Sequence, residues 1–310
     1  MAPIDFKERL LKGLGGPFPE PCELNPVLLT RELHDGYELQ RITYQSELND
    51  RVPAILLIPE GVSGENPSPA VCVWHQHNGQ WHLGKSEPAG LAGNPMHHTG
   101  LALVKLGYVV LCPDAIGFEE RAKGYKLSGA NLERLLYLKY VVRGKTMAWK
   151  NVVDMRRAVD YLAGLPEVDA GNIGCYGHSM GSTHAYMLGP WEPRIKATVC
   201  NCCLPTYEAI EENEILHCFP NFVTGIYPDA DTPDIVSLIA PRPLHMNFGE
   251  LDGGSPIKHV RRAMPEIKRV YESMHADENF SYYIEDGADH VLSAEMWRLT
   301  KDFFDRHLKQ

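Results

Sequence analysis

The chain has 310 residues, of which 44% are hydrophobic and 23% charged, with a net charge of −10 at pH 7. These values are ordinary for a globular protein with a sizeable core, and the acidic balance argues against nucleic acid or an anionic membrane as a partner. The chain lacks both a signal-peptide pattern and an apolar run of roughly 18 residues, so we expect a cytoplasmic protein without a membrane span.

The predicted elements follow a mixed N-terminal extension over residues 1–36, in which "GGPFPEP" interrupts regular structure. Alternating or short apolar segments predict strands over 37–48, 51–60, 69–76, 108–115, 171–177, 195–202, 242–250 and 280–286. Apolar residues at steps of three and four predict helices over 98–107, 131–142, 149–166, 179–188, 257–274 and 293–308.

This order of elements predicts the fold class. Strands alternate with helices after an antiparallel start, which is typical of an α/β protein with a mostly parallel, here eight-stranded, sheet covered by helices on both faces. We expect a single domain over residues 1–310. Two irregular insertions, residues 115–150 and 204–240, are long enough to cover a binding site.

Eight cysteines are present, several of them in strand-like runs such as "AVCVW" and "ATVCNCC". Buried, reduced thiols explain this placement more simply than disulfides do, which agrees with a cytoplasmic location.

The segment "IGCYGHSMGSTHA" joins a predicted strand to a predicted helix through Gly-x-Ser-x-Gly. A serine on a sharp strand-to-helix turn is the arrangement of a nucleophile elbow, which exposes the Ser179 hydroxyl above the sheet. The alternative is a glycine-rich turn with an incidental serine. The position between two regular elements favours the nucleophile.

A serine nucleophile needs a histidine base and a carboxylate that orients the base. Among the histidines downstream of Ser179, His290 alone lies in a loop between the last strand and the last helix. The acid is expected after the preceding strand, in "NFGELDGGSP", which offers Glu250 and Asp252. The turn position favours Asp252 over Glu250.

The oxyanion of an acyl-transfer reaction needs backbone donors. The Met180 N–H at the start of the helix is one candidate, and the N–H of His77 or of Gln76 after the third predicted strand is the other. The alternative, a metal site made of His75, His77 and His82, has no interleaved carboxylate. We therefore expect neither a metal nor a cofactor.

The chain resembles the α/β-hydrolase superfamily, in the branch of dienelactone hydrolases and acetyl-xylan-type esterases. The resemblance covers residues 37–308 and rests on these motifs: "HQHNG", "GKSEPAGLAG", "GYVVLCPDAIGF", "VVDMRRAVDYLAGLPEVDAGNIGCYGHSMG", "PRPLHMNFGELDGGSP" and "DGADHVL". It implies an α/β-hydrolase fold with Ser179 as nucleophile, Asp252 as acid and His290 as base. Dienelactone hydrolases carry a cysteine nucleophile where this chain has serine, so their lactone specificity does not transfer. Many relatives also have His-Gly where this chain has His75-Gln76.

These residues predict a serine hydrolase that acts through an acyl-enzyme. Its expected substrates are small-molecule carboxylic esters with short-chain or acetyl groups. The alternatives are an amidase or peptidase with the same triad, and a ligand-binding receptor that kept the fold without catalysis. A homo-oligomeric state stays open. Five aromatic residues in or beside the insertions are candidate walls of the substrate pocket: Phe118, Trp149, Phe219, Phe222 and Tyr227.

Overall fold

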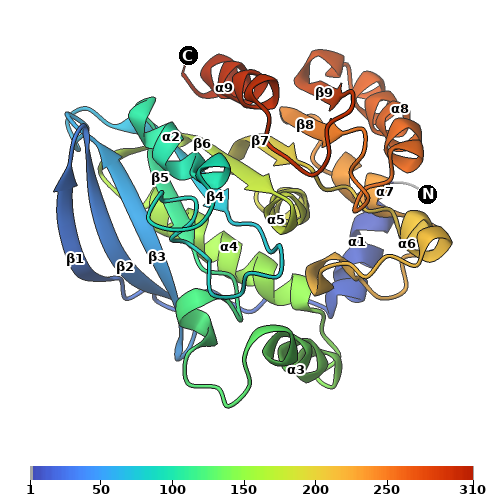
Figure 1. The fold of residues 1–310 in the computed structure, drawn as a ribbon, viewed down its shortest axis with the longest axis horizontal. Coiled ribbons are helices and arrows are strands. Elements are labelled where there is room, and N and C mark those ends of the chain that lie inside the picture. The colour runs from blue at the N-terminus through green and yellow to red at the C-terminus, as the bar shows by residue number, and fades with distance from the viewer. Residues whose placement is uncertain (1–2, 310) are drawn as a thin grey trace.

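A nine-stranded sheet crosses the protein in the computed structural model, which describes residues 3–309 (Figure 1). The strand order is β1-β2-β3-β5-β4-β6-β7-β8-β9. The bounds are β1 Val27–His34, β2 Tyr37–Glu47, β3 Asp50–Pro59, β4 Ser68–Trp74, β5 Val109–Pro113, β6 Val168–His178, β7 Ile195–Asn201, β8 Leu244–Gly249 and β9 Phe280–Glu285. The pairs β1–β2, β2–β3 and β3–β5 are antiparallel, and the strands from β5 to β9 run parallel.

Helices cover both faces of this sheet. Their bounds are α1 Pro3–Leu14, α2 Thr99–Lys105, α3 Gly129–Val141, α4 Met147–Ala163, α5 Met180–Leu188, α6 Tyr207–Asn213, α7 Thr232–Ser237, α8 Ile257–Ser273 and α9 Ala294–Leu308. Side chains of α2 and α9 form one apolar layer with the sheet, and those of α1, α4, α5, α7 and α8 form the layer on the other face.

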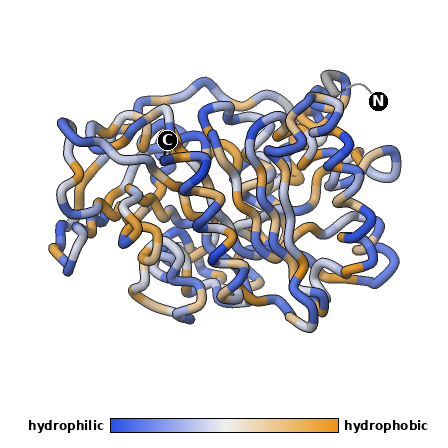
Figure 2. Tube along the Cα trace, turned by 90° about the horizontal axis from the view of Figure 1, so that it is seen from above, coloured by the Kyte–Doolittle hydropathy of each residue, from blue (hydrophilic) through white to orange (hydrophobic). Residues whose placement is uncertain are grey.

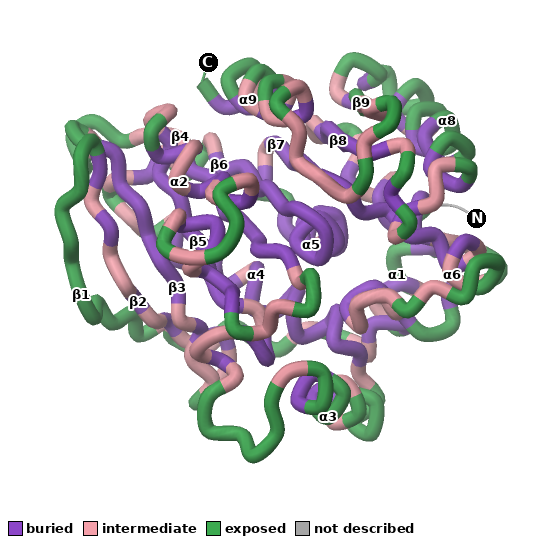
Figure 3. The backbone as a smooth tube through the Cα atoms, in the orientation of Figure 1, coloured by how far each residue is buried: buried purple, intermediate pink, exposed green. Residues whose placement is uncertain are grey.

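The core lies in these two layers, and the helix after the predicted elbow is at its centre. Every residue of α5 is buried, as Figure 3 shows. Apolar and polar residues are interleaved along the whole chain (Figure 2), because most helices present one face to the sheet and one to solvent, whereas the central strands β4, β5 and β8 are buried on both faces. The C-terminal ends of the parallel strands therefore hold their loops on a rigid support.

The eight predicted strands and the α/β class are confirmed, but the sheet has a ninth strand. It is β1, within the extension 1–36, which also contains α1. All eight residues of β1 are exposed at the edge of the sheet. An edge strand that buries neither face needs no regular apolar alternation, so the periodicity that reveals the other strands is missing here.

The helix predicted over 131–142 in the first insertion is confirmed as α3, and the second insertion, expected to be irregular, contains the short helices α6 and α7. Buried ion pairs tie the first insertion to the sheet. Asp154 of α4 accepts from Arg121 at 2.6 Å and pairs with Lys150 at 2.7 Å, and Lys150 also reaches Glu47 of β2 at 2.6 Å. None of the described helices is both long and apolar enough to cross a membrane.

Candidate active site

Ser179 follows β6 directly and precedes α5. Its backbone has φ 58° and ψ −121°, a conformation in which residues with a side chain are strained. The Ser179 N–H donates to Asn201 O on the neighbouring strand at 2.9 Å, which anchors the turn. Ser179 as a whole residue is 8% exposed. This is the geometry of a nucleophile elbow.

The two glycines of the motif are required because the chain passes very close to itself on both sides of Ser179. A Cβ atom at Gly177 would overlap the backbone carbonyl of Gly181, and a Cβ at Gly181 would overlap Trp74 O on β4. The spacing of two on each side of the serine therefore follows from packing the turn against the helix and the adjacent strand.

Asp252 and His290 are in direct contact. His290 Nδ1 lies 2.8 Å from Asp252 Oδ2, and the other Asp252 oxygen accepts from Gly254 N–H at 2.9 Å. Asp252 is 3% exposed, whereas the His290 side chain is 34% exposed. The rival carboxylate, Glu250, instead accepts from Arg261 at 3.0 Å on the surface. The geometry thus pairs His290 with Asp252.

An open cavity of about 520 Å³ brings these three residues together, since Ser179, Asp252 and His290 all line its wall. The rest of the wall comes from residues 77–79 after β4 and from residues 215–219 of the second insertion. Both insertions contribute to it, because Glu133 of α3 also lines the cavity.

Of the five aromatic residues predicted to line the pocket, the structure places Phe219 in this wall. The other four do not line the cavity. Phe118 is 1% exposed and packs against the rings of His75 and His77, at centroid distances of 5.0 and 5.2 Å. Trp149, Phe222 and Tyr227 pack against the main apolar core. Sequence position within an insertion cannot distinguish a wall residue from a core residue.

The predicted oxyanion donors separate in the structure. Met180 is the first residue of α5, so its N–H has no acceptor within the helix and is available beside Ser179. His77 lines the cavity. Gln76 is buried, and its side chain donates to Glu87 at 3.0 Å beside a different, smaller pocket. The lining residues do not place the backbone N–H of Gln76 or of His77, so the second oxyanion donor stays a prediction.

The sequence matches the model of the Abhydrolase family over residues 17–291, most of the chain. The chain belongs to the Abhydrolase family. It is 30% identical over 270 residues to "Putative hydrolase YtaP" of Bacillus subtilis (strain 168), which covers 86% of this chain and 87% of that protein. The predicted membership of the α/β-hydrolase superfamily is thereby confirmed.

Solved structures share the fold. A "putative acetyl xylan esterase" from Bacteroides fragilis NCTC 9343 superposes with a TM-score of 0.72 at 20% identity, over 91% of this chain and 74% of that one. A glucuronoyl esterase from Solibacter usitatus gives 0.68 at 14% identity, over 97% and 91% of the two chains. These similarities confirm the α/β-hydrolase fold.

In this Abhydrolase family member, a row of imidazoles that the sequence did not reveal stands beside the nucleophile. The His178 ring lies 5.1 Å from the His290 ring and 4.5 Å from the His97 ring, between centroids. Asn201 Nδ2 donates to His178 Nδ1 at 2.6 Å. Burial, together with the nearby His290 and His97, holds the pKa of His178 well below the ordinary value. His178 therefore stays neutral beside His290.

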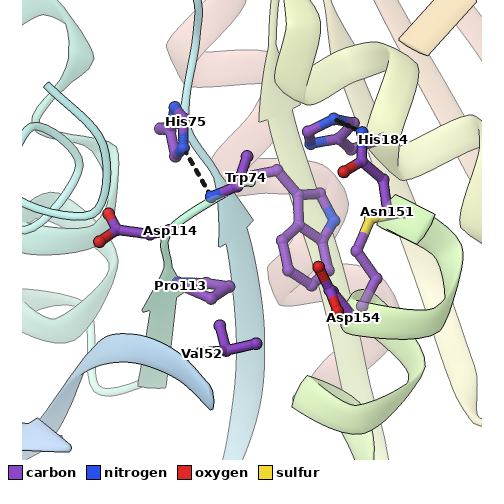
Figure 4. A pocket seen from close by; sticks show the side chains of 10 residues that line it. Val52, Trp74, His75, Pro113, Asp114, Asn151, Asp154 and His184 are labelled. Atoms are coloured by element: carbon purple, nitrogen blue, oxygen red, sulfur yellow. Dashed lines mark hydrogen bonds between the residues drawn. The ribbon is translucent and has the colours of Figure 1, made fainter. Parts of the chain in front are cut away.

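Two more buried histidines, His75 and His184, line a small cavity of about 20 Å³ (Figure 4). His75 Nε2 accepts from Ala115 N–H at 3.0 Å while Nδ1 lies 2.7 Å from Gln76 O, and His184 Nε2 lies 3.0 Å from Asn151 Nδ2. Burial lowers the pKa of His75 to about 4 and that of His184 to about 3. Both imidazoles are therefore neutral, buried side chains whose hydrogen bonds hold neighbouring segments together.

The structure shows which contacts are made by the side chains that could act as metal ligands. His77 uses both ring nitrogens elsewhere, Nε2 with Glu133 and Nδ1 with Gly79 N–H, each at 2.9 Å. Among the described residues, one set of possible ligands has its oxygens close together: Asp114, Glu119 and Glu120. The Lys85 ammonium contacts all three at 2.7–2.9 Å and provides the positive charge there.

The buried histidines predict acid destabilisation of this Abhydrolase protein. In the folded state the pKa of His184 lies below its unfolded value, so the unfolded chain takes up the proton first and stability is lost as pH falls from about 6.5 to about 3. At about 1.4 kcal/mol per unit, the expected loss from this histidine is on the order of 3 kcal/mol by pH 4 and about 5 kcal/mol over the whole range. Urea unfolding from pH 7 to 4 should show a flatter dependence for His184→Gln than for the wild type, while His82→Gln, at an exposed histidine, should follow the wild type. Parallel curves for wild type and His184→Gln would contradict this.

Proposed function

We propose that this protein is a serine hydrolase that cleaves carboxylic esters through an acyl-enzyme. The observation that carries the proposal is the joint position of Ser179, Asp252 and His290 in the wall of one cavity, with Ser179 on an elbow and His290 bonded to Asp252. Nucleophile, base and orienting carboxylate are the three parts that acyl transfer needs.

In this mechanism Ser179 Oγ attacks the ester carbonyl carbon, and His290 Nε2 takes the serine proton. Asp252 holds His290 with its Nδ1–H donating to the carboxylate, and stabilises the imidazolium that forms. The N–H groups of Met180 and His77 stabilise the oxyanion. His290 then returns the proton to the leaving alcohol, and a water activated by His290 hydrolyses the acyl-serine.

The substrate side of the proposal rests on the size of the site and on its relatives. Small-molecule esters with short acyl groups, including acetyl groups, suit an open cavity of about 520 Å³. Several structural neighbours are named as acetyl xylan or glucuronoyl esterases. Hydrolysis of amides by the same three residues is the second candidate. Parallel assays of a p-nitrophenyl ester and the matching p-nitroanilide separate ester from amide preference.

A cytoplasmic location is part of the same proposal. All eight cysteines are free thiols in the structure, six of them buried, as a reducing compartment favours. Neither a cofactor nor a metal is required by the chemistry proposed for Ser179. The dienelactone-hydrolase-like branch and a homo-oligomeric state stay predictions from the sequence.

The direct test is covalent labelling of the serine. A fluorophosphonate probe should form one adduct, on Ser179, located by peptide mass spectrometry, because the elbow serine is activated by His290. The matched control is Ser182→Ala: the Ser182 hydroxyl is buried and donates to Cys203 O at 3.0 Å, so its loss should leave labelling intact. Ser179→Ala should remove it. An adduct on a different serine would contradict the proposal and indicate another nucleophile. A protein that binds an ester without hydrolysing it would instead be a receptor.

A further inference from the structure

Glu133 is a buried carboxylate in the wall of the candidate catalytic cavity, and one of its oxygens is unpartnered. The side chain is 5% exposed. Oε2 accepts hydrogen bonds from His77 Nε2 and from Trp81 Nε1, both at 2.9 Å. Oε1 is buried too, and none of the residues that the structure describes donates to it. The two bonds to Oε2 fix the carboxylate and leave Oε1 as a free acceptor.

The partners of Glu133 are themselves held in place. His77 Nδ1 accepts from the N–H of Gly79 at 2.9 Å, so the ring proton of a neutral His77 is on Nε2 and is donated to Glu133. Burying an acceptor without a donor is unfavourable by about 1–3 kcal/mol, and by more when the group is charged. The missing donor must come from outside the described residues, as a water molecule or as a ligand in the cavity that Glu133 lines.

The charge around Glu133 points the same way. Among the described residues that line the cavity there is no lysine or arginine, whereas Asp252 and Asp289 also line it. No protein cation of this wall therefore neutralises Glu133. A ligand group that donates a hydrogen bond to a carboxylate is stabilised here, and a second anion is repelled.

We propose that Glu133 is a specificity-determining residue: its Oε1 accepts a hydrogen bond from the substrate, so that preferred substrates carry a hydroxyl or an ammonium group near the ester and anionic esters are rejected. The proposal rests on the ester hydrolysis proposed for the same cavity, and it names the chemical class of ester that this cavity selects. Hydroxyl and ammonium share the required donor, and the experiment separates them.

The experiment compares four esters of similar size by pH-stat titration: propyl butyrate, 2-hydroxyethyl butyrate, protonated 2-(dimethylamino)ethyl butyrate and the monoanion of ethyl hydrogen succinate. For the wild type, kcat/KM for at least one donor-bearing ester should exceed that for propyl butyrate by about 10-fold or more, as expected for a hydrogen bond to a charged group. The succinate ester should be the poorest substrate. A higher value for the ammonium ester than for the hydroxyl ester assigns the donor as cationic, and the reverse order assigns it as a hydroxyl.

The diagnostic variant is Glu133→Gln. Its amide oxygen can still accept from His77 and Trp81, which leaves an N–H₂ donor at the position of Oε1. The ratio of kcat/KM for the donor-bearing esters to that for propyl butyrate should fall toward one, mainly through KM, and the succinate ester should improve. Glu214→Gln removes an exposed carboxylate from the adjoining loop 214–219 and should keep the wild-type ratios.

The outcomes distinguish this inference from the proposed function. A wild type that hydrolyses all four esters equally, or a folded Glu133→Gln with unchanged ratios, overturns the role of Glu133 and leaves ester hydrolysis intact. If Glu133→Gln does not fold, the wild-type ratios alone still decide. A wild type that hydrolyses none of the esters and is not labelled at Ser179 overturns both.

Discussion

His290→Ala should reduce kcat for ester hydrolysis by about 10⁶-fold, the order of loss seen when the base of such a triad is removed. The reason is geometric: His290 reaches both the cavity that Ser179 lines and, through Nδ1, the Asp252 carboxylate at 2.8 Å. Steady-state rates with an aryl ester, together with the melting temperature of each variant, separate lost chemistry from lost folding.

The matched control for this variant is His77→Ala. His77 lines the same cavity, but its backbone N–H and not its ring is proposed to act in catalysis, so this variant should keep a measurable part of the activity. Near-normal turnover by folded His290→Ala would end the triad interpretation. The base would then have to be another histidine near Ser179: His217, which also lines the cavity, His178, or one of the two in the "HQH" segment after β4.

Asp252→Asn should lower kcat by about 10⁴-fold while the fold is retained. An amide at this position can donate its N–H₂ to His290 Nδ1 and so stabilise the tautomer that carries its proton on Nε2, which cannot act as a base toward Ser179. Asp252 is 3% exposed, so water cannot readily replace the lost acceptor. Turnover measured across pH gives the size of the loss.

The comparison for Asp252 is the neighbouring carboxylate. Glu250→Gln removes a surface pair with Arg261 at 3.0 Å, and such pairs contribute little to stability. Its turnover should stay within a few-fold of the wild type. A large loss in Glu250→Gln combined with a small loss in Asp252→Asn would mean that the acid has been assigned to the wrong residue.

The sequence was most informative where a local pattern and a packing requirement coincide. The strand before Ser179, the helix after it and the glycines at 177 and 181 are all needed for one turn, so their order predicted its structure. The pairing of His290 with Asp252 also followed from chain order, since parallel strands end at the same edge of the sheet. Even there, the approach of the two loops depends on Gly249, where a Cβ would overlap Asp289 O.

The remainder of the site depends on contacts between distant segments. Glu133, His77 and Trp81 come from two parts of the chain that meet only in the fold. One signal was available: Glu133 stands next to Leu132 and three residues before Leu136, so it places a charge on the buried side of α3. By contrast, Trp149 and Phe222 illustrate that aromatic residues in an insertion can just as well belong to the core.

The backbone conformation of residue 179 lowers the stability of the fold, whereas the proposed chemistry needs a serine at this position. With φ 58° and ψ −121°, this position favours glycine, which adopts such angles freely, over any residue with a Cβ. A backbone held in this region stores about 1–3 kcal/mol, an appreciable part of the free energy that keeps a domain folded. Selection for thermodynamic stability alone would therefore replace the serine with glycine. That a hydroxyl-bearing residue stands there means that the fold tolerates a permanent local penalty, and tight packing by Gly177 and Gly181 supplies the rigidity that this requires.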